Sequence, residues 1–464
     1  MDVLIILLAL LFLMVVAYRG FSVIVFAPVA SLLAVLLTGP RFVLPFYSGV
    51  FMDRVAGFVK LYFPVFLLGA IFGKLIEVSG FARSIIRAVV SVVGPGKAIL
   101  AVVTVCALLT YGGVSLFVVA FAVYPFAAEL FRAADIPKRL IPATIALGAF
   151  TFTMDALPGS PQIQNIIPTT FFHTDAWAAP RMGLVGAAFV LVAGLAYLEW
   201  RRALARRAGE GYGEGHLQEP AAPAEEHLPN PLVAILPLVL VGVLNKIFTL
   251  WLPKIYGEKF DFSAAGVEKI DTIDVGRTAA LWAVEGALVA AIVLVLLCSL
   301  GRLRSRLGAA ANAAVGGAML AALNTGSEYG FGGVISLLPG FKVVNQFLTH
   351  TIRDPLLNVA VTTNTLAGIT GSASGGMSIV LASMGQAYLE RAQAAGIPPE
   401  VVHRVAAMAS GGMDTLPHNG AVITLLAVTG LTHRHSYRDI FAITLFKTVA
   451  VFVAIGFYYL FGVY

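Results

Sequence analysis

Long apolar blocks separated by short polar stretches make up most of the chain. Many are about 20 residues long, the length that an α-helix needs to cross the hydrocarbon core of a bilayer. The blocks fall at residues 2–18, 21–38, 57–78, 98–131, 138–172, 181–200, 231–250, 278–300, 309–338, 356–390, 401–430 and 438–462. This pattern predicts an all-α polytopic membrane protein, because a membrane helix satisfies all of its backbone hydrogen bonds internally.

Composition supports this prediction. Hydrophobic residues make up 59% of the chain and charged residues only 12%, whereas soluble domains carry about 25% charged residues. The net charge of +6 is spread over short loops, which fits orientation by cytoplasmic Lys and Arg better than nucleic-acid binding. Cys106 and Cys298 lie inside apolar stretches, so neither a disulfide nor a metal cluster is expected. No cofactor is expected either.

One long polar stretch divides the chain into two halves. Residues 201–229 are rich in Arg, Glu, Gly, Ala and Pro, and we expect them to form a cytoplasmic linker. The halves are then 1–200 and 230–464. The first apolar run has no basic flank and no clear cleavage site, so it is interpreted as a retained helix rather than a signal peptide.

Two blocks in each half depart from a simple span. Blocks 98–131 and 356–390 are too long for one helix and carry glycine and serine at their centres, which predicts re-entrant hairpins. The following blocks, 138–172 and 401–430, contain proline near their middles. Proline removes a backbone donor and clashes with the preceding turn, so we expect both helices to be broken within the membrane.

These features recur in the same order in both halves. GGVS at 112–115 matches GGMS at 375–378, Ile-Pro at 136–137 matches 397–398, and MDALP at 154–158 matches MDTLP at 413–417. The offsets are 263, 261 and 259 residues. Each half then holds about five spans plus one hairpin, and an odd number of spans inverts the second half. Inverted repeats with broken helices are typical of secondary transporters.

The motifs resemble those of a known family. GGVS, TMDALPGSPQIQN, GGMS and GMDTLPHNGAVIT are similar to sequences of the gluconate permease family, the gluconate:proton symporters of the ion transporter superfamily. The second break looks most like the 3-hydroxybutyrate-type branch. The resemblance implies import of a small hydroxy acid with a cation, across the bacterial inner membrane, by a homodimer. Related proteins bind sodium with a Ser-Asn-Thr tip that this chain lacks, so proton and sodium both stay open.

The hairpin tips and helix breaks are the candidate substrate site. Backbone N–H groups exposed at helix N-termini favour a carboxylate, and glycine lets substrate approach the backbone. Close helix packing is the alternative role for these small residues. The candidate substrate-binding residues are Gly112, Gly113, Val114, Ser115, Gln162, Asn165, Ser372, Ser374, Gly375, Gly376, Ser378, His418 and Asn419.

Three acidic residues are candidates for ion coupling. Asp155 and Asp414 occupy matching positions beside the two helix-breaking prolines, and Glu328 lies in another apolar block. Intramembrane carboxylates commonly mark proton or ion pathways, although an aspartate at a break can also cap freed N–H groups. His418 beside Asp414 favours the second aspartate as the proton carrier. Sodium coordination near the aspartates stays an alternative.

The sequence therefore predicts a non-enzymatic secondary transporter. Its expected partners are a small organic anion, a proton or sodium ion, and the lipid bilayer. An ion-only cation antiporter and an anion channel are the main alternatives. An intramembrane aspartyl protease is remote, because the sequence around the aspartates lacks the motifs of that class and such a protease would leave the duplicated hairpins unexplained.

Overall fold

The chain folds almost entirely into helices. The computed structural model describes residues 2–19, 21–216, 219–220, 228–266, 272–417 and 419–464. Within these ranges the only strands are β1 (Lys259–Phe260) and β2 (Ile273–Asp274), which pair antiparallel. Seven helical segments of the described chain are long and apolar enough to cross a membrane. The predicted all-α polytopic class is confirmed.

The first half contains both long helices and short, interrupted ones. Its elements are α1 (Asp2–Tyr18), α2 (Val23–Thr38), η1 (Pro40–Phe42), α3 (Val43–Phe46), η2 (Tyr47–Phe51), α4 (Met52–Val78), α5 (Phe81–Val93), η3 (Pro95–Lys97), α6 (Ala98–Tyr111), α7 (Leu116–Ala133), η4 (Lys138–Leu140), α8 (Ile141–Ala149), α9 (Phe152–Asp155), α10 (Ile163–Phe172) and α11 (Pro180–Arg207). The elements from η1 to α4 follow one another without a gap and form one long span.

The second half has a similar mixture. Its helices are α12 (Pro231–Tyr256), η5 (Phe262–Ala265), α13 (Val275–Leu303), α14 (Leu307–Leu337), α15 (Pro339–Thr351), α16 (Pro355–Thr370), α17 (Ala373–Ala394), α18 (Pro399–Ser410), α19 (Gly420–Thr429) and α20 (His433–Phe461).

Helix positions repeat between the halves. The starts of α6 and α16, of α7 and α17, and of α10 and α19 are each 257 residues apart, and those of α8 and α18 are 258 apart. The residues that precede these helices repeat too: Ser115 and Ser372 precede α7 and α17, and Gln162 and Asn419 precede α10 and α19. The two halves therefore share one helix pattern. Their inverted orientation across the membrane stays a prediction.

The glycine pairs of the two hairpins do not occupy equivalent places. Gly112 and Gly113 form the turn between α6 and α7, whereas Gly375 and Gly376 lie inside the first turns of α17. The second turn is made by Gly371 (φ 65°) and Ser372 instead. The match between GGVS and GGMS is thus six residues out of the helix register. Glycine is tolerated both in a turn and in a close helix contact, which explains the false alignment.

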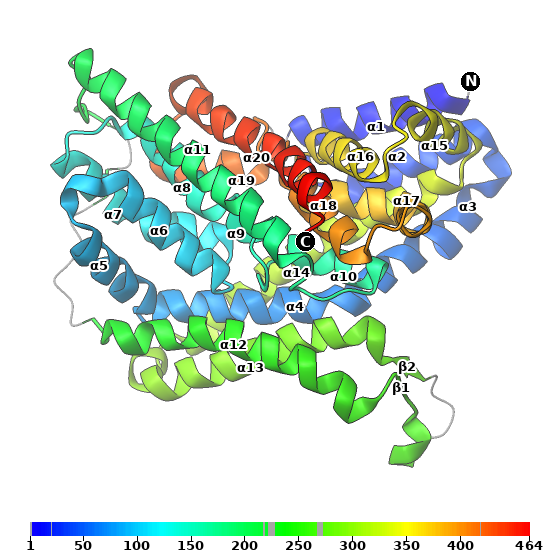
Figure 1. Cartoon of the computed structure of the whole chain (residues 1–464), viewed down its shortest axis with the longest axis horizontal. Coiled ribbons are helices and arrows are strands. Elements are labelled where there is room, and N and C mark those ends of the chain that lie inside the picture. Colours follow the sequence, from blue (N-terminus) through cyan, green and yellow to red (C-terminus); the bar gives the residue numbers. More distant parts are fainter. Residues whose placement is uncertain (1, 20, 217–218, 221–227, 267–271, 418) are drawn as a thin grey trace.

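Two helix pairs flank the interrupted helices. Figure 1 shows α12 and α13 side by side along one edge of the molecule, next to α4, while α11 and α20 pack together on the opposite side. α4 also packs along α14, and α14 packs on α17. The short helices α8, α9, α10 and α18 lie between these layers and are largely buried. Non-helical backbone at this depth is enclosed by protein, as a membrane interior requires.

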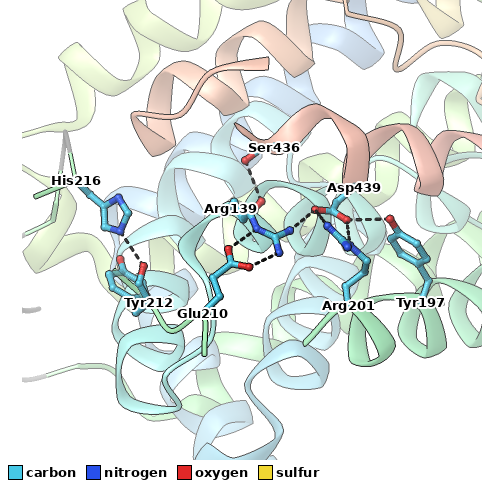
Figure 2. Close-up of polar contacts among 8 residues, drawn as sticks. All are labelled: Arg139, Tyr197, Arg201, Glu210, Tyr212, His216, Ser436 and Asp439. Atoms are coloured by element: carbon cyan, nitrogen blue, oxygen red, sulfur yellow. Dashed lines mark hydrogen bonds and ion pairs between the residues drawn. The ribbon is translucent and has the colours of Figure 1, made fainter. Parts of the chain in front are cut away.

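An ion-pair network fastens the end of α11 to α20. Asp439 accepts hydrogen bonds from Arg201 Nε at 2.6 Å, Tyr197 Oη at 2.8 Å and Arg139 Nη1 at 3.0 Å. Arg139 also makes two parallel bonds, at 2.6 and 2.8 Å, to Glu210 (Figure 2). α11 extends to Arg207, into the predicted linker. The first part of the linker is therefore anchored to both halves.

A second set of contacts holds the linker to the connector after α7. Glu219 pairs with Arg132 and lies 2.8 Å from Nζ of Lys138, and Asp135 accepts from the backbone N–H of Tyr212 at 2.9 Å. The arginine and lysine residues that the sequence assigned to membrane orientation thus also bind this segment.

Candidate functional site

The first hairpin tip is tied to the first helix break. Gly113 has φ 96°, a left-handed conformation that favours glycine. The Gln162 side chain donates through Nε2 to the carbonyl oxygens of Thr110, at 2.7 Å, and Val114, at 3.3 Å. Gln162 directly precedes α10 and Ser115 directly precedes α7. The N-termini of these two helices are therefore held close together.

The second half repeats this arrangement with different residues. Asn419 accepts from the backbone N–H groups of Ala421 and Val422, at 2.6 and 3.0 Å, and so caps α19. Its Nδ2 donates to the carbonyl of Gly371 at 2.7 Å, which ties the break to the second tip. Ser372 caps α17 by accepting from Gly375 N–H at 3.0 Å. Each half thus brings two helix N-termini together.

Two of the predicted tip glycines serve close packing. A Cβ on Gly376 would overlap the backbone of Ala367 on α16, so the two legs of the hairpin touch there. A Cβ on Gly112 would overlap the Leu238 side chain on α12. At both positions the contact partner is the protein itself, which agrees with the alternative role for small residues in membrane helices.

The two predicted aspartates meet at one lysine. Lys447 on α20 donates to Oδ1 of Asp414 at 2.7 Å, with side chains that are 3% and 10% exposed. Asp155 lies on the same side of Gly411 as Lys447, because a Cβ on that glycine would overlap Oδ2 of Asp155 and come within 3.3 Å of Cε of Lys447. Residues from α9, the second break and α20 therefore form one buried cluster, here named the Asp155–Lys447–Asp414 cluster.

The aspartates differ in their pairing. Asp414 has the ion pair with Lys447, whereas no basic nitrogen of the described residues lies within 4 Å of the Asp155 carboxylate oxygens. Both carboxylates are buried, at 6% and 7% residue exposure. A buried carboxylate must be paired with a positive charge or be protonated. Within the described chain, Asp155 is the aspartate that lacks such an ion pair. His418, which favoured the second aspartate in the sequence, lies outside the described residues.

A buried arginine organises the first break. Arg404 on α18 is fully buried, and its Nη1 donates to the carbonyl of Asp155 at 2.7 Å and to Oδ1 of Asn165 at 2.9 Å. Its Nε and Nη2 both donate to the carbonyl of Ala178. Asn165 in turn donates to the carbonyls of Ser160 and Ala176. Asn165, predicted to bind substrate, therefore holds together the segments that precede and follow α10.

Glu328 lies at the second tip, away from the aspartates. It projects from α14, is 3% exposed, and has no ion pair among the described residues. A Cβ on Gly375 would overlap its carboxylate, which places the acid against the first turn of α17. Nearby, Ser374 and Thr325 share a hydrogen bond of 3.3 Å. Ser378, one turn further along α17, is buried, and its hydroxyl has no hydrogen-bond partner among the residues that the structure describes.

Sequence reasoning missed three charged or titratable residues of the site: Lys447, Arg404 and His403. His403 Nδ1 lies 2.6 Å from the hydroxyl of Thr174 and is fully buried. The available signal was the same one that identified the aspartates, since each residue interrupts an apolar block. Among the described residues, no three His, Cys, Asp or Glu side chains gather as they would to hold a metal ion.

A cleft of about 590 Å³ lies beside the first tip, between α6 and α12. Its walls are mainly apolar and include Gly112, Leu238 and Trp177. Lys246 also lines the cleft, and its ammonium lies 5.0 Å from the centre of the Trp177 ring. No member of the Asp155–Lys447–Asp414 cluster lines this cleft, so the cleft and the charged cluster are separate features.

Comparison with known proteins identifies a close relative. No protein-family model matches the chain. The chain is 60% identical to the Bacillus subtilis protein named "Uncharacterized transporter YxjC", over 100% of both sequences. Among solved structures, the YdaH transporter of Alcanivorax borkumensis aligns with a TM-score of 0.48 at 15% identity, covering 88% of this chain and 87% of that one. MtrF of Neisseria gonorrhoeae, described with a class of antimetabolite efflux pumps, aligns at 0.46 and 12% identity, covering 88% and 82%.

Proposed function

Because the chain belongs to the same family as the Bacillus subtilis transporter YxjC, we propose that it is a secondary active transporter that imports a small hydroxycarboxylate together with a proton. That it is a multi-pass transporter of the cytoplasmic membrane follows from this relationship and from its membrane helices. The substrate, the direction of transport and the coupling ion are the proposal.

The paired helix N-termini support a carboxylate substrate. Each helix N-terminus carries roughly half a positive charge and several N–H groups without partners inside the helix. Gln162 holds the start of α10 near the start of α7, and Asn419 holds the start of α19 near the start of α17. Each pair attracts an anion without requiring a buried cation. The resemblance to gluconate permeases directs the choice to 3-hydroxybutyrate or gluconate.

The Asp155–Lys447–Asp414 cluster is the observation that carries the proposed coupling. It contains two buried carboxylates and one ammonium, and that ammonium is bonded to Asp414. Arg404 gives its hydrogen bonds to neutral oxygens, those of two carbonyls and an amide. A proton on Asp155 would neutralise the carboxylate that has no ion pair among the described residues. Uptake and release of that proton would thereby couple the cluster to a proton gradient.

The position of Lys447 favours the proton over sodium. Its Nζ lies 2.7 Å from Oδ1 of Asp414, within the space that a sodium ion coordinated by both aspartates would need. Sodium would have to displace this tethered ammonium, whereas a proton can bind to Asp155 without displacing it. The cluster also joins α9 of the first half to the second break and α20, so its charge bears on how the two halves pack.

Uptake into proteoliposomes tests this proposal. Labelled 3-hydroxybutyrate and gluconate would be offered under a proton gradient alone and a sodium gradient alone. We expect saturable accumulation of at least one anion under the proton gradient, and none under the sodium gradient. Accumulation that requires sodium would refute the proposed coupling while leaving a carboxylate transporter in place.

The same vesicles separate the alternatives. An ion-only antiporter would exchange protons for another cation without either anion. A channel would pass the anion down its gradient without saturation and would not accumulate it. Cation exchange alone, or flux that never saturates, would therefore replace the proposed function.

A further inference from the structure

We propose that the first turn of α17 is the seat of the substrate carboxylate and that Glu328 occupies this seat when substrate is absent. The inference rests on the proposed function, since it assigns the place and the competitor of the anion that the transporter carries. It also gives Glu328 a role distinct from that of the Asp155–Lys447–Asp414 cluster.

The geometry of Gly375 is the first observation. The Glu328 carboxylate fills the space where a side chain would lie, so its oxygens touch the backbone of the first turn of α17. The first N–H groups of a helix lack partners within it and favour a negative charge. Of these, Gly375 N–H donates to Ser372. The glycine thus lets a carboxylate lie against the first turn of α17, and the carboxylate found there belongs to the protein.

The isolation of Glu328 is the second observation. The residue is 3% exposed, and no charged side chain of the described residues pairs with it. Two basic residues of α4 are directed elsewhere. Arg54 packs on Gly333, which is more than one turn beyond Glu328 on α14, and Lys60 is exposed. The titratable groups on the side of α14 that faces α4 are Tyr62 and Tyr329, and both of their rings contact the ring of Phe58.

The remaining neighbours supply hydroxyls rather than charges. α2, α10 and the first three turns of α17 contain no acidic, basic or histidine side chain. Ser374 bonds to Thr325 at 3.3 Å, and the buried hydroxyl of Ser378 has no hydrogen-bond partner within the described part of the chain. Two of these hydroxyls belong to the first two turns of α17, and the third lies on α14 within one turn of Glu328. They are suited to a substrate that carries a hydroxyl beside its carboxylate.

Two carboxylates cannot share this seat while both are charged. Like charges at contact distance in a low-dielectric site repel each other strongly. Substrate binding at the first turn of α17 therefore requires Glu328 to take up a proton or to leave. When Glu328 takes up a proton, the anion and that proton enter together, and substrate affinity then depends on pH at this position.

Binding of 3-hydroxybutyrate and gluconate to the purified full chain, measured over a range of pH, tests the inference. In wild type we expect the affinity for the anion to fall by about tenfold for each unit that pH rises, over the range where Glu328 is ionised. Glu328→Gln mimics the protonated acid, so its affinity should be high and independent of pH. Glu285→Gln is the matched control, because Glu285 is a partly buried glutamate of α13 that does not contact α17 in this way. It should retain the wild-type pH profile.

A second pair of variants tests the geometry without any ligand. Gly375→Ala places a methyl group where the Glu328 carboxylate lies, so the variant should lose thermal stability. Adding Glu328→Ala should restore most of that loss, because it removes the overlapping group. If Gly375→Ala is as stable as wild type, or if Glu328→Ala restores nothing, Glu328 does not occupy this turn.

The outcomes separate the two proposals. If wild type binds an anion and Glu328→Gln shows the same pH profile, the seat is elsewhere and the proposed function stands. If wild type and Glu328→Gln both bind neither anion at any pH, the substrate class and this inference fail together. Restored stability in the double variant would support the position of Glu328 against Gly375. Binding that is independent of pH in Glu328→Gln would support its competition with the substrate.

Discussion

Replacing Lys447 with methionine should strongly destabilise the protein. The side chain keeps its length and apolar stem but loses the ammonium that lies 2.7 Å from Asp414. Both partners are buried. At this distance and an effective dielectric constant of about 20, the attraction is about 6 kcal/mol before desolvation is subtracted. Breaking one side of a buried pair costs about 3–5 kcal/mol, because the remaining charge has no partner.

A double variant distinguishes the ion pair from simple packing. Asp414→Asn combined with Lys447→Met leaves neither charge, so its stability should lie well above that of Lys447→Met and within about 1–2 kcal/mol of wild type. Lys246→Met is the control. That lysine lies over the Trp177 ring and is exposed, so its loss should cost no more than about 1 kcal/mol.

Equilibrium unfolding in mixed detergent micelles, followed by the fluorescence of the four tryptophans, would measure these differences. Wild-type stability in Lys447→Met would refute the reasoning, since it would mean that no charged carboxylate depends on the lysine. Equal losses in the single and the double variant would show that packing of the lysine stem, rather than charge, accounts for the effect.

Four further predictions concern coupling at Asp155, the linker, the second hairpin and the topology. Asp155→Asn should abolish proton-driven accumulation in vesicles while substrate exchange persists, and full accumulation would exclude an essential charge at Asp155. The hydrogen bond from Arg139 lowers the pKa of Glu210, so the stabilising contact is complete above the ordinary glutamate pKa and is lost as pH falls through the lower pKa of the folded state. Limited proteolysis of the linker should therefore increase in that acidic range. Glu210→Gln should be cleaved readily at every pH, whereas Glu214→Gln on the same segment should behave as wild type. Gly376→Ala should lower the melting temperature, because its methyl group would overlap Ala367, whereas unchanged melting would show that α16 can move aside. Cysteines at positions 132 and 394 should be labelled from opposite sides of the membrane, and labelling from one side would contradict the inverted repeat.

Several features of this protein follow from local sequence. Apolar blocks of membrane-spanning length determine an all-helical membrane fold, because a lipid environment leaves the backbone no other way to satisfy its hydrogen bonds. Proline and glycine end helices through their own geometry. The breaks after α8 and α18, and the turns after α6 and α16, therefore lie inside the blocks in which the sequence predicts them.

Register between the halves is the point where sequence similarity was misleading. The two GG-x-S motifs look equivalent, yet one forms a turn and the other lies within a helix. Backbone packing decides the role of each glycine. Gly376 contacts α16 and Gly112 contacts α12, and neither partner can be identified from the neighbouring residues in the sequence.

Only the tertiary structure decided which charges meet. Asp155, Asp414 and Glu328 stand out in the sequence because a carboxylate in an apolar block is costly. Their partners are set by how distant helices pack. Lys447 reaches Asp414 from α20, Asp155 approaches the same lysine from the other half of the chain, and Glu328 is left against Gly375 with no counter-charge among the described residues. A lone charge in an apolar block reveals that a partner is needed, but the identity of that partner depends on long-range contacts that local sequence does not encode.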